Sequence, residues 1–176
     1  IARLLPAHKN LGENRDFSAQ SVLKAIDIGT GAGFPGLPVA IALPNLSVTL
    51  LDSTRKKIDF LEKLLPSLTI KNAATLLGRS DEIWRQPHHK AAYDIALLRA
   101  VGAASICAKY ALPFLKNGGL AVLYRGNWTA EEEADLQSAI GPLGGIVESV
   151  EAFTTPVSHS VRHCVYLRKV VQQLER

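Results

Sequence analysis

Residues 27–36 of the chain are Asp27-Ile-Gly-Thr-Gly-Ala-Gly-Phe-Pro-Gly36, the glycine-rich stretch that decides the fold. The apolar residues 25–28 predict a short buried strand before the glycines, and residues 36–42 predict a helix after them, with Pro35 close to its start. Glycine has no Cβ atom, so a loop of this kind lets the backbone approach a ligand closely. A strand, a glycine loop and a helix in this order predict the first unit of an open α/β sheet.

Strand and helix patterns alternate along the rest of the chain. The expected strands are 47–51, 73–77, 93–98, 120–124, 146–153 and 164–171, and the expected helices are 54–65, 105–115 and 129–140. Alternation of this kind predicts an α/β fold, a mostly parallel twisted sheet of about seven strands with helices on both faces. The last two strands have no clear helix between them, so they predict an antiparallel hairpin at the sheet edge.

A boundary is expected near residue 25. Residues 25–176 form the expected α/β domain. Residues 1–24 are expected to be the end of a helix plus a loop, because polar residues and Gly12 interrupt their few apolar positions. The sequence contains no methionine, even at position 1, so we expect residues 1–24 to be the remnant of a longer N-terminal segment.

The composition limits the class of protein. The 176 residues are 47% hydrophobic, which suits one domain with a sizeable core. No apolar run is long enough to span a bilayer and no secretory signal is visible, so we expect a cytoplasmic chain without membrane association. Cys107 and Cys164 lack metal-ligand spacing and predict reduced, buried thiols. The net charge of +4 is compatible with a polyanionic partner but does not require one.

Two classes of ligand compete for the glycine loop. Gly31, Gly33 and Gly36 fit G-x-G-x-x-G, the dinucleotide fingerprint, which alone is a weak signal. In the other frame the loop begins at Gly29, and a carboxylate, Asp27, stands two residues before it. A carboxylate at the strand end repels a pyrophosphate but attracts the ammonium and sulfonium groups of S-adenosylmethionine. We therefore favour S-adenosylmethionine, and an NAD-linked oxidoreductase is the alternative.

Two further acids follow the next two strands. Asp52 follows strand 47–51, where a carboxylate can accept hydrogen bonds from both hydroxyls of a ribose. Asp81 follows strand 73–77, next to the backbone of Ser80, and two compatible interpretations stay open for it. It accepts a hydrogen bond from an adenine amino group, or it caps a short helix. A glycine loop and two acids in this order favour a nucleoside-binding pocket over an ordinary tight turn.

Several segments together resemble one known family of enzymes. They are Asp27-Ile-Gly-Thr-Gly-Ala-Gly-Phe-Pro-Gly36, Leu51-Asp-Ser53, Leu98-Arg-Ala-Val101, Tyr124-Arg-Gly126 and Arg162-His163 before a strand. From about residue 25 to residue 169 the chain is similar to the RsmG family, also called GidB, the ribosomal small-subunit methyltransferases G. The resemblance implies a Rossmann-like class I methyltransferase fold that uses S-adenosylmethionine. It further implies methylation of a guanine N7 in bacterial 16S ribosomal RNA, with that RNA or the small ribosomal subunit as partner.

The resemblance also implies where the cofactor lies. Gly29 and Phe34 are expected at its methionine and ribose end, Ser53 and Thr54 at the ribose beside Asp52, and Arg99 beside the cofactor. Together with the residues singled out above, the expected cofactor-binding set is Asp27, Gly29, Gly31, Phe34, Asp52, Ser53, Thr54, Ser80, Asp81 and Arg99.

The chemistry of guanine N7 limits what the site must contain. N7 carries a lone pair and no proton at neutral pH, so its methylation needs orientation rather than a general base. Arg99 or Arg125 is expected to donate a hydrogen bond to guanine O6 and so to act in catalysis. For Arg99 the structural alternative is an ion pair with Asp27. We expect a monomer without a metal. A module that binds S-adenosylmethionine but acts on another acceptor remains a further alternative.

Overall fold

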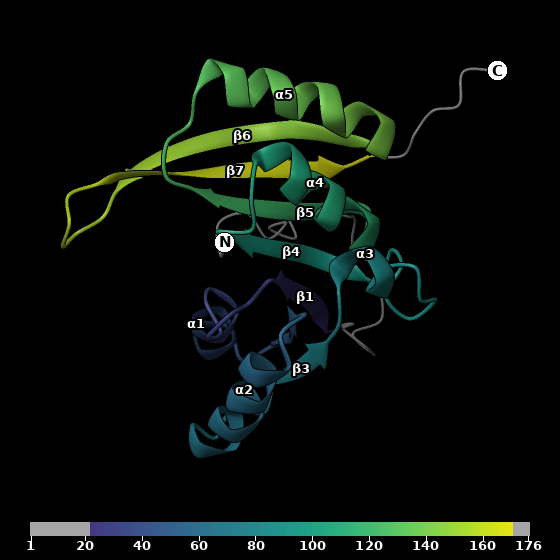
Figure 1. Cartoon of the computed structure of the whole chain (residues 1–176), viewed down its shortest axis with the longest axis vertical. Coiled ribbons are helices and arrows are strands. Elements are labelled where there is room, and N and C mark those ends of the chain that lie inside the picture. Colours follow the sequence, from purple (N-terminus) through teal and green to yellow (C-terminus); the bar gives the residue numbers. More distant parts are fainter. Residues whose placement is uncertain (1–21, 171–176) are drawn as a thin grey trace, which may run out of the picture.

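The computed structural model describes residues 22–170, which contain one mixed β-sheet (Figure 1). Its strands are β1 (Leu23–Ile28), β2 (Leu46–Asp52), β3 (Ala73–Leu77), β4 (Tyr93–Arg99), β5 (Leu115–Arg125), β6 (Gly145–Thr154) and β7 (Val161–Lys169). Their order in the sheet is β3-β2-β1-β4-β5-β7-β6. Strands β1 to β5 pair in parallel, and β7 is antiparallel to both β5 and β6. The predicted sheet, mostly parallel with an antiparallel edge hairpin, is confirmed.

Helices cover both faces of this sheet. They are α1 (Gly36–Ala42), α2 (Arg55–Ser67), α3 (Ser80–Ile83), α4 (Ala104–Ala111) and α5 (Ala130–Ile140), with 3-10 turns η1 (Leu112–Phe114) and η2 (Gly141–Leu143). Leu97 of β4 belongs to the hydrophobic cluster that includes α1 and α2, whereas its neighbour Leu98 belongs to the cluster that includes α4 and α5. Successive side chains of a strand point to opposite faces. The predicted helices on both faces are therefore confirmed.

The largest departure from prediction lies around Pro113. The helix expected over residues 105–115 ends at Ala111, and η1 follows it. Proline has no N–H group and its ring clashes with the preceding turn, so it kinks or breaks an α-helix. The segment 117–119 lies near the start of β5, where the pairing with β4 shifts register. Its two glycines allow this irregularity in the strand.

The remaining boundaries differ by a few residues. Strand β1 begins at Leu23, so it extends into the expected N-terminal remnant, and β7 begins at Val161 rather than at 164. The rest of that remnant, residues 1–21, lies outside the described residues.

The topology creates one natural binding position. Strands β1 and β4 are neighbours, but the chain leaves β1 toward α1 on one face and leaves β4 toward α4 on the other. The loops after these two strands therefore diverge and leave a crevice at the carboxyl ends of the strands. Ligands of open α/β sheets bind at such a position.

Gly36→Ala is expected to destabilise the domain by about 1–3 kcal/mol, because extra atoms in a tightly packed site force their neighbours to move. A Cβ atom at Gly36 would lie 2.4 Å from Leu50 Cδ2 and 2.7 Å from Asp27 Oδ2. Denaturant unfolding followed by circular dichroism measures the change. Gly141→Ala is the matched control, since a Cβ atom at Gly141 meets nothing within 4 Å. Equal stability of the two variants would contradict the close packing at Gly36.

Candidate functional site

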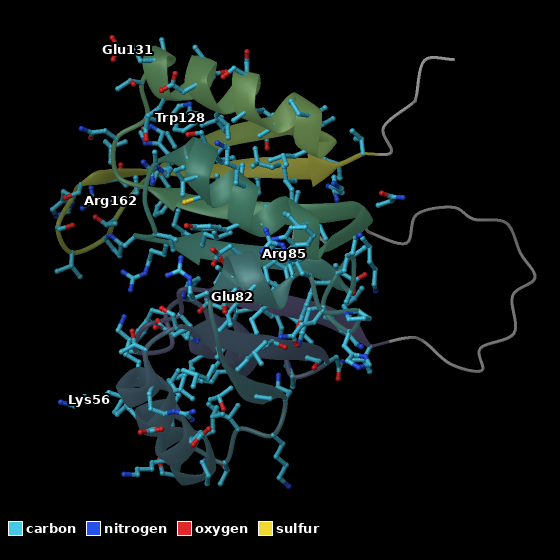
Figure 2. The ribbon with its side chains drawn as sticks, turned by 45° about the vertical axis from the view of Figure 1, so that its right-hand side comes forward. Lys56, Glu82, Arg85, Trp128, Glu131 and Arg162 are labelled. Atoms are coloured by element: carbon cyan, nitrogen blue, oxygen red, sulfur yellow. The ribbon has the colours of Figure 1, made fainter. Side chains whose placement is uncertain are left out.

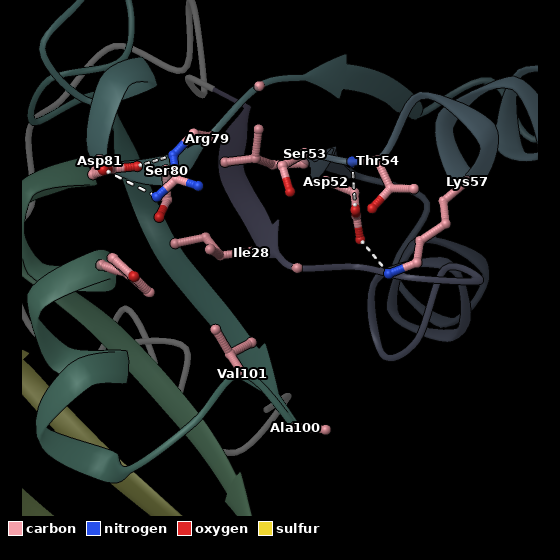
Figure 3. Close-up of a pocket in the computed structure, with 14 residues that line it drawn as sticks. Ile28, Asp52, Ser53, Thr54, Lys57, Arg79, Ser80, Asp81, Ala100 and Val101 are labelled. Carbon is pink, nitrogen blue, oxygen red and sulfur yellow. Dashed lines mark hydrogen bonds and ion pairs between the residues drawn. The ribbon is translucent and has the colours of Figure 1, made fainter.

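A pocket of about 260 Å³ opens at the carboxyl ends of β1 to β4 (Figure 3). Six of the expected cofactor-binding residues line it, namely Gly29, Asp52, Ser53, Thr54, Ser80 and Asp81. The other four, Asp27, Gly31, Phe34 and Arg99, are not among its lining residues and lie within or beside the glycine loop. The structure therefore brings the three separate strand ends singled out in the sequence to one cavity.

Asp27 lies beneath the glycine loop, and its side chain is fully buried. Its Oδ2 atom accepts hydrogen bonds from Thr30 Oγ1 at 2.6 Å and from the Gly36 backbone N–H at 2.8 Å. Its Oδ1 atom is also buried and has no hydrogen-bond partner among the described residues. Burial raises the pKa of Asp27 to about 6, although the hydrogen bonds from Thr30 and Gly36 act in the opposite direction. Asp27 thus holds both ends of the loop.

The loop is also fastened to the neighbouring strand. The backbone N–H groups of Gly29 and Thr30 both donate to the carbonyl oxygen of Leu51 in β2, at 2.9 and 3.0 Å. Gly29, Gly31 and Gly33 have φ angles of +70°, +61° and +97°, which residues with a Cβ atom rarely adopt. The glycines are therefore required by the backbone conformation that brings Gly29 to the pocket wall.

Asp52 is the acidic centre of the pocket. Its Oδ1 accepts from the Thr54 N–H at 2.9 Å, and its Oδ2 accepts from the Gly31 N–H at 3.0 Å and from Lys57 Nζ at 3.5 Å. Burial alone would raise the pKa of Asp52, but the backbone hydrogen bonds from Thr54 and Gly31 outweigh it and lower the pKa below its ordinary value. An ionised carboxylate therefore lines the pocket at neutral pH.

Asp81 lies in the first turn of α3, next to Ser80 on the pocket wall. The helix cap position is Arg79 rather than Asp81, so the capping interpretation of Asp81 is wrong. The Nε atom of Arg79 donates to Asp81 Oδ1 at 3.1 Å, and this bond lowers the pKa of Asp81. Asp81 thus presents an ionised carboxylate on the wall of the pocket, paired with Arg79 through both of its oxygens.

Arg99 and Phe34 lie together at the edge of the glycine loop. The Nε atom of Arg99 donates to the Phe34 carbonyl oxygen at 3.4 Å, and Arg99 Cζ lies 5.9 Å from the centre of the Phe34 ring. Both residues are exposed. The ion pair considered between Arg99 and Asp27 does not form among the described residues, although the positive charge of Arg99 lowers the pKa of Asp27.

Arg125 occupies a different environment, at the end of β5. Its two terminal nitrogens donate to the Gly102 carbonyl oxygen and to the Glu132 carboxylate, and its side chain is only 17% exposed. The N–H of Glu132 donates in turn to Thr129 Oγ1 at 3.2 Å, so Thr129 caps the start of α5. Arg125 therefore joins β5 and α5 to the loop that follows β4.

Eight of the fourteen residues that line the pocket lie outside the expected cofactor-binding set, namely Ile28, Leu51, Lys57, Gly78, Arg79, Ala100, Val101 and Tyr110. Two of them, Lys57 and Arg79, bring positive charges beside Asp52 and Asp81. Lys57 lies in the first turn of α2, which brings its cation back to Asp52. Its neighbour Lys56 points away from the domain (Figure 2). The five-residue spacing from Asp52 to Lys57 could have predicted this contact from the sequence. The position of Tyr110 at the pocket depends on the packing of α4, which the sequence does not reveal.

The described residues give no sign of a metal centre or a membrane span. Within residues 22–170, no group of three or more His, Cys, Asp or Glu side chains could hold a metal ion. No helix in this range is long and apolar enough to cross a membrane. Cys107 and Cys164 are buried and free, as predicted.

Comparison with known proteins places the chain in a family. The profile of the GidB family, described as rRNA small subunit methyltransferase G, matches residues 14–165. The chain belongs to this family. It is 63% identical over 145 residues to the ribosomal RNA small subunit methyltransferase G of Nostoc punctiforme, covering 82% of this chain and 59% of that relative. The namesake from Trichormus variabilis is 61% identical over 147 residues, covering 84% and 60%. The chain thus spans about three fifths of the length of these relatives.

Solved structures of low sequence identity share the fold. A methyltransferase from Methanosarcina mazei, described as SAM-dependent, has a TM-score of 0.64 at 15% identity and covers 85% of this chain and 93% of its own. TYW2 of M. jannaschii, solved in complex with AdoMet, has a TM-score of 0.65 at 14% identity and covers 84% of this chain and 69% of its own. The predicted Rossmann-like methyltransferase fold is therefore confirmed.

Asp27→Asn is expected to change how the stability of the domain depends on pH. The pKa of Asp27 rises from 3.8 to about 6 on folding, so this carboxyl group costs stability as the pH rises from about 4 to about 6, and the cost is complete above that range. The loss amounts to at most about 3 kcal/mol, since one pKa unit corresponds to about 1.36 kcal/mol. Asparagine carries no charge, so the variant lacks this loss.

Urea unfolding at about pH 4 and about pH 8 measures the effect. The free energy of unfolding of Asp27→Asn, relative to the unaltered chain, is expected to increase between the two pH values. Asp59→Asn in α2 is the control, because it removes the same formal charge outside the glycine loop. A relative stability of Asp27→Asn that stays constant with pH would show that the buried carboxyl is not the cause.

Proposed function

We propose that this chain transfers the methyl group of S-adenosylmethionine to N7 of a guanine in 16S ribosomal RNA. Membership of the family described as rRNA small subunit methyltransferase G supports this assignment. The observation that carries it is Asp52, a carboxylate with a lowered pKa in a pocket whose wall also contains Gly29 and Asp81. The proposed partner is 16S RNA or the small ribosomal subunit, and the proposed location is the bacterial cytoplasm. We also propose that the chain is a monomer.

The residues around the pocket fit S-adenosylmethionine. Asp52 suits the two ribose hydroxyls because a carboxylate can accept both hydrogen bonds. Ser80 and Asp81 offer acceptors to the adenine amino group. The methionine end carries an ammonium and a sulfonium group, and both cations suit the side of Asp27, whose buried Oδ1 has no partner among the described residues. The glycine loop lets this end of the ligand approach the backbone.

Methyl transfer to N7 requires little from the protein beyond alignment. When bound, S-adenosylmethionine supplies an electrophilic methyl carbon on a cationic sulfur. The lone pair of guanine N7 forms the new N–C bond as the C–S bond breaks, and the electrons of the broken bond stay on sulfur. The positive charge passes to the base, and no proton moves at N7. The residues of this chain therefore act by holding the base in line with the methyl group.

Arg99 is better placed than Arg125 to orient the base. Arg99 is exposed, and the residue that follows it, Ala100, lines the pocket. Both terminal nitrogens of Arg125 are already engaged by Gly102 and Glu132. We therefore assign the hydrogen bond to guanine O6 to Arg99 and assign Arg125 to holding the loop after β4. A donor to O6 leaves the lone pair of N7 free.

Two experiments separate this function from its alternatives. Calorimetric titration with S-adenosylmethionine and with NAD distinguishes a methyltransferase from an oxidoreductase, and only the first is expected to bind. Incubation with undermethylated small subunits, followed by mass mapping of 16S RNA, tests the acceptor. A new 7-methylguanine is the expected product. Binding of S-adenosylmethionine without methylation of the RNA would favour a module that acts on another acceptor.

Asp52→Asn is expected to weaken the binding of S-adenosylhomocysteine about tenfold, because hydrogen bonds to an ionised acceptor are worth about 1.5–3 kcal/mol. Calorimetry measures the dissociation constant. Asp59→Asn in α2 is the charge-matched control and is expected to bind like the unaltered chain, since Asp59 does not line the pocket. Unchanged affinity of Asp52→Asn would remove Asp52 from the ribose site.

Arg99→Ala is expected to lower the rate of methyl transfer about tenfold or more, because one hydrogen bond from a charged donor to O6 is lost. The affinity for S-adenosylhomocysteine is expected to stay within about threefold, since Arg99 does not line the pocket. Single-turnover transfer to small subunits and calorimetry measure the two quantities. Full activity of Arg99→Ala would refute the assignment to O6.

A further inference from the structure

Phe34 is a large aromatic residue that the fold leaves exposed to solvent. Its exposed fraction is 51%, although an aromatic ring contributes most to stability when it is buried. The backbone beneath the ring is fixed, because the Phe34 N–H donates to the Thr30 carbonyl oxygen at 3.1 Å and Thr30 is itself held by Asp27. The loop therefore presents the ring from a well-defined position.

The ring lies next to the end of the pocket assigned to the methionine part of S-adenosylmethionine. Gly29 begins the loop that ends in Phe34, and Gly29 lines the pocket together with Ala100. Arg99, the residue before Ala100, donates to the Phe34 carbonyl oxygen. Figure 3 shows Ala100 on a different side of the pocket from Asp81, the residue assigned to the adenine. Phe34 therefore borders the methionine end of the pocket rather than its adenine end.

A flat cation already lies over this ring. The guanidinium carbon of Arg99 is 5.9 Å from the ring centre, which is within the range of a cation–π contact. A planar, positively charged group can therefore lie over the face of this ring. A guanine methylated at N7 is also planar and positively charged.

We propose that the ring of Phe34 stacks on the guanine to be methylated and that it prefers the cationic, N7-methylated base to the neutral one. The inference rests on the proposed function, because it deepens the assignment of a guanine as the acceptor. The entering base takes the place of the Arg99 guanidinium on the ring. Arg99 is then free to donate to O6.

The preference follows from the charge that methylation creates. The face of an aromatic ring carries partial negative charge, so it attracts a cation more strongly than a neutral base. Positive charge builds up on guanine as the N–C bond forms. The ring therefore stabilises the transition state more than it stabilises the complex with the neutral base. Only such a difference accelerates the transfer.

A nucleotide titration tests the preference without methyl transfer. The unaltered chain, saturated with S-adenosylhomocysteine, is titrated with 7-methylguanosine 5′-monophosphate and with guanosine 5′-monophosphate, and nuclear magnetic resonance reports binding. The methylated nucleotide is expected to bind about tenfold more tightly. Phe34→Leu is expected to abolish this difference, and Phe34→Trp is expected to keep it. Phe60→Leu in α2 is the matched control, since Phe60 is 50% exposed and does not line the pocket.

Single-turnover methylation of small subunits is the second readout. Phe34→Leu is expected to lower the rate about tenfold, whereas Phe34→Trp and Phe60→Leu are expected to stay within about threefold of the unaltered chain. If Phe34→Leu matches Phe60→Leu in both assays, the inference is overturned. If the unaltered chain methylates no RNA, the proposed function fails. The nucleotide titration then still decides the role of Phe34.

Discussion

The site depends on one buried carboxylate, Asp27, and on the two hydrogen bonds that it accepts. Placing a carboxylate in the core is costly unless donors compensate it, and here Thr30 and Gly36 supply them from opposite ends of the glycine loop. The same loop is fastened to β2 through the Leu51 carbonyl oxygen. These contacts fix the direction in which the backbone leaves β1, and the position of Phe34 follows from that direction. The raised pKa of Asp27 shows that the compensation is incomplete.

The acidic groups around the pocket lie in different environments. Asp52 and Asp81 line the cavity and have lowered pKa values, but each pairs with a cation that also lines it, Asp52 with Lys57 and Asp81 with Arg79. The buried Asp27 adds a third acidic group below the loop. A pyrophosphate on the glycine loop would be repelled by Asp27. The N–H groups of Gly29, Thr30 and Gly31 already donate to Leu51 and Asp52. The sulfonium and ammonium groups of S-adenosylmethionine meet attraction instead. The glycine fingerprint alone did not distinguish the two ligands, and Asp52 suits the ribose of either one, whereas Asp27 favours S-adenosylmethionine.

Much of this arrangement could be predicted from the sequence, because it depends on local patterns. Apolar runs located every strand, and the ends of those strands located Asp52 and Asp81. What could not be predicted were contacts between distant segments. The sequence did not reveal the partners of Arg125, because Gly102 lies in the loop after β4 and Glu132 lies in α5, and no spacing rule connects them. The helix over residues 105–115 was predicted too long, because its apolar pattern continues through Pro113 while the backbone cannot.

The pair of Lys57 and Asp52 illustrates why an exposed charge can matter at a site without stabilising the fold. Lys57 is 52% exposed, and an ion pair with such a solvated partner contributes little to stability, about 0–1 kcal/mol. Its effect on the pocket is larger, because the cation stands 3.5 Å from a carboxylate that is only 5% exposed. Lys57 shares Oδ2 with the Gly31 N–H, so it limits the repulsion among the acids before a ligand enters. The ligand then needs to replace only a weak, solvated contact, and the backbone hydrogen bonds that orient Asp52 stay in place.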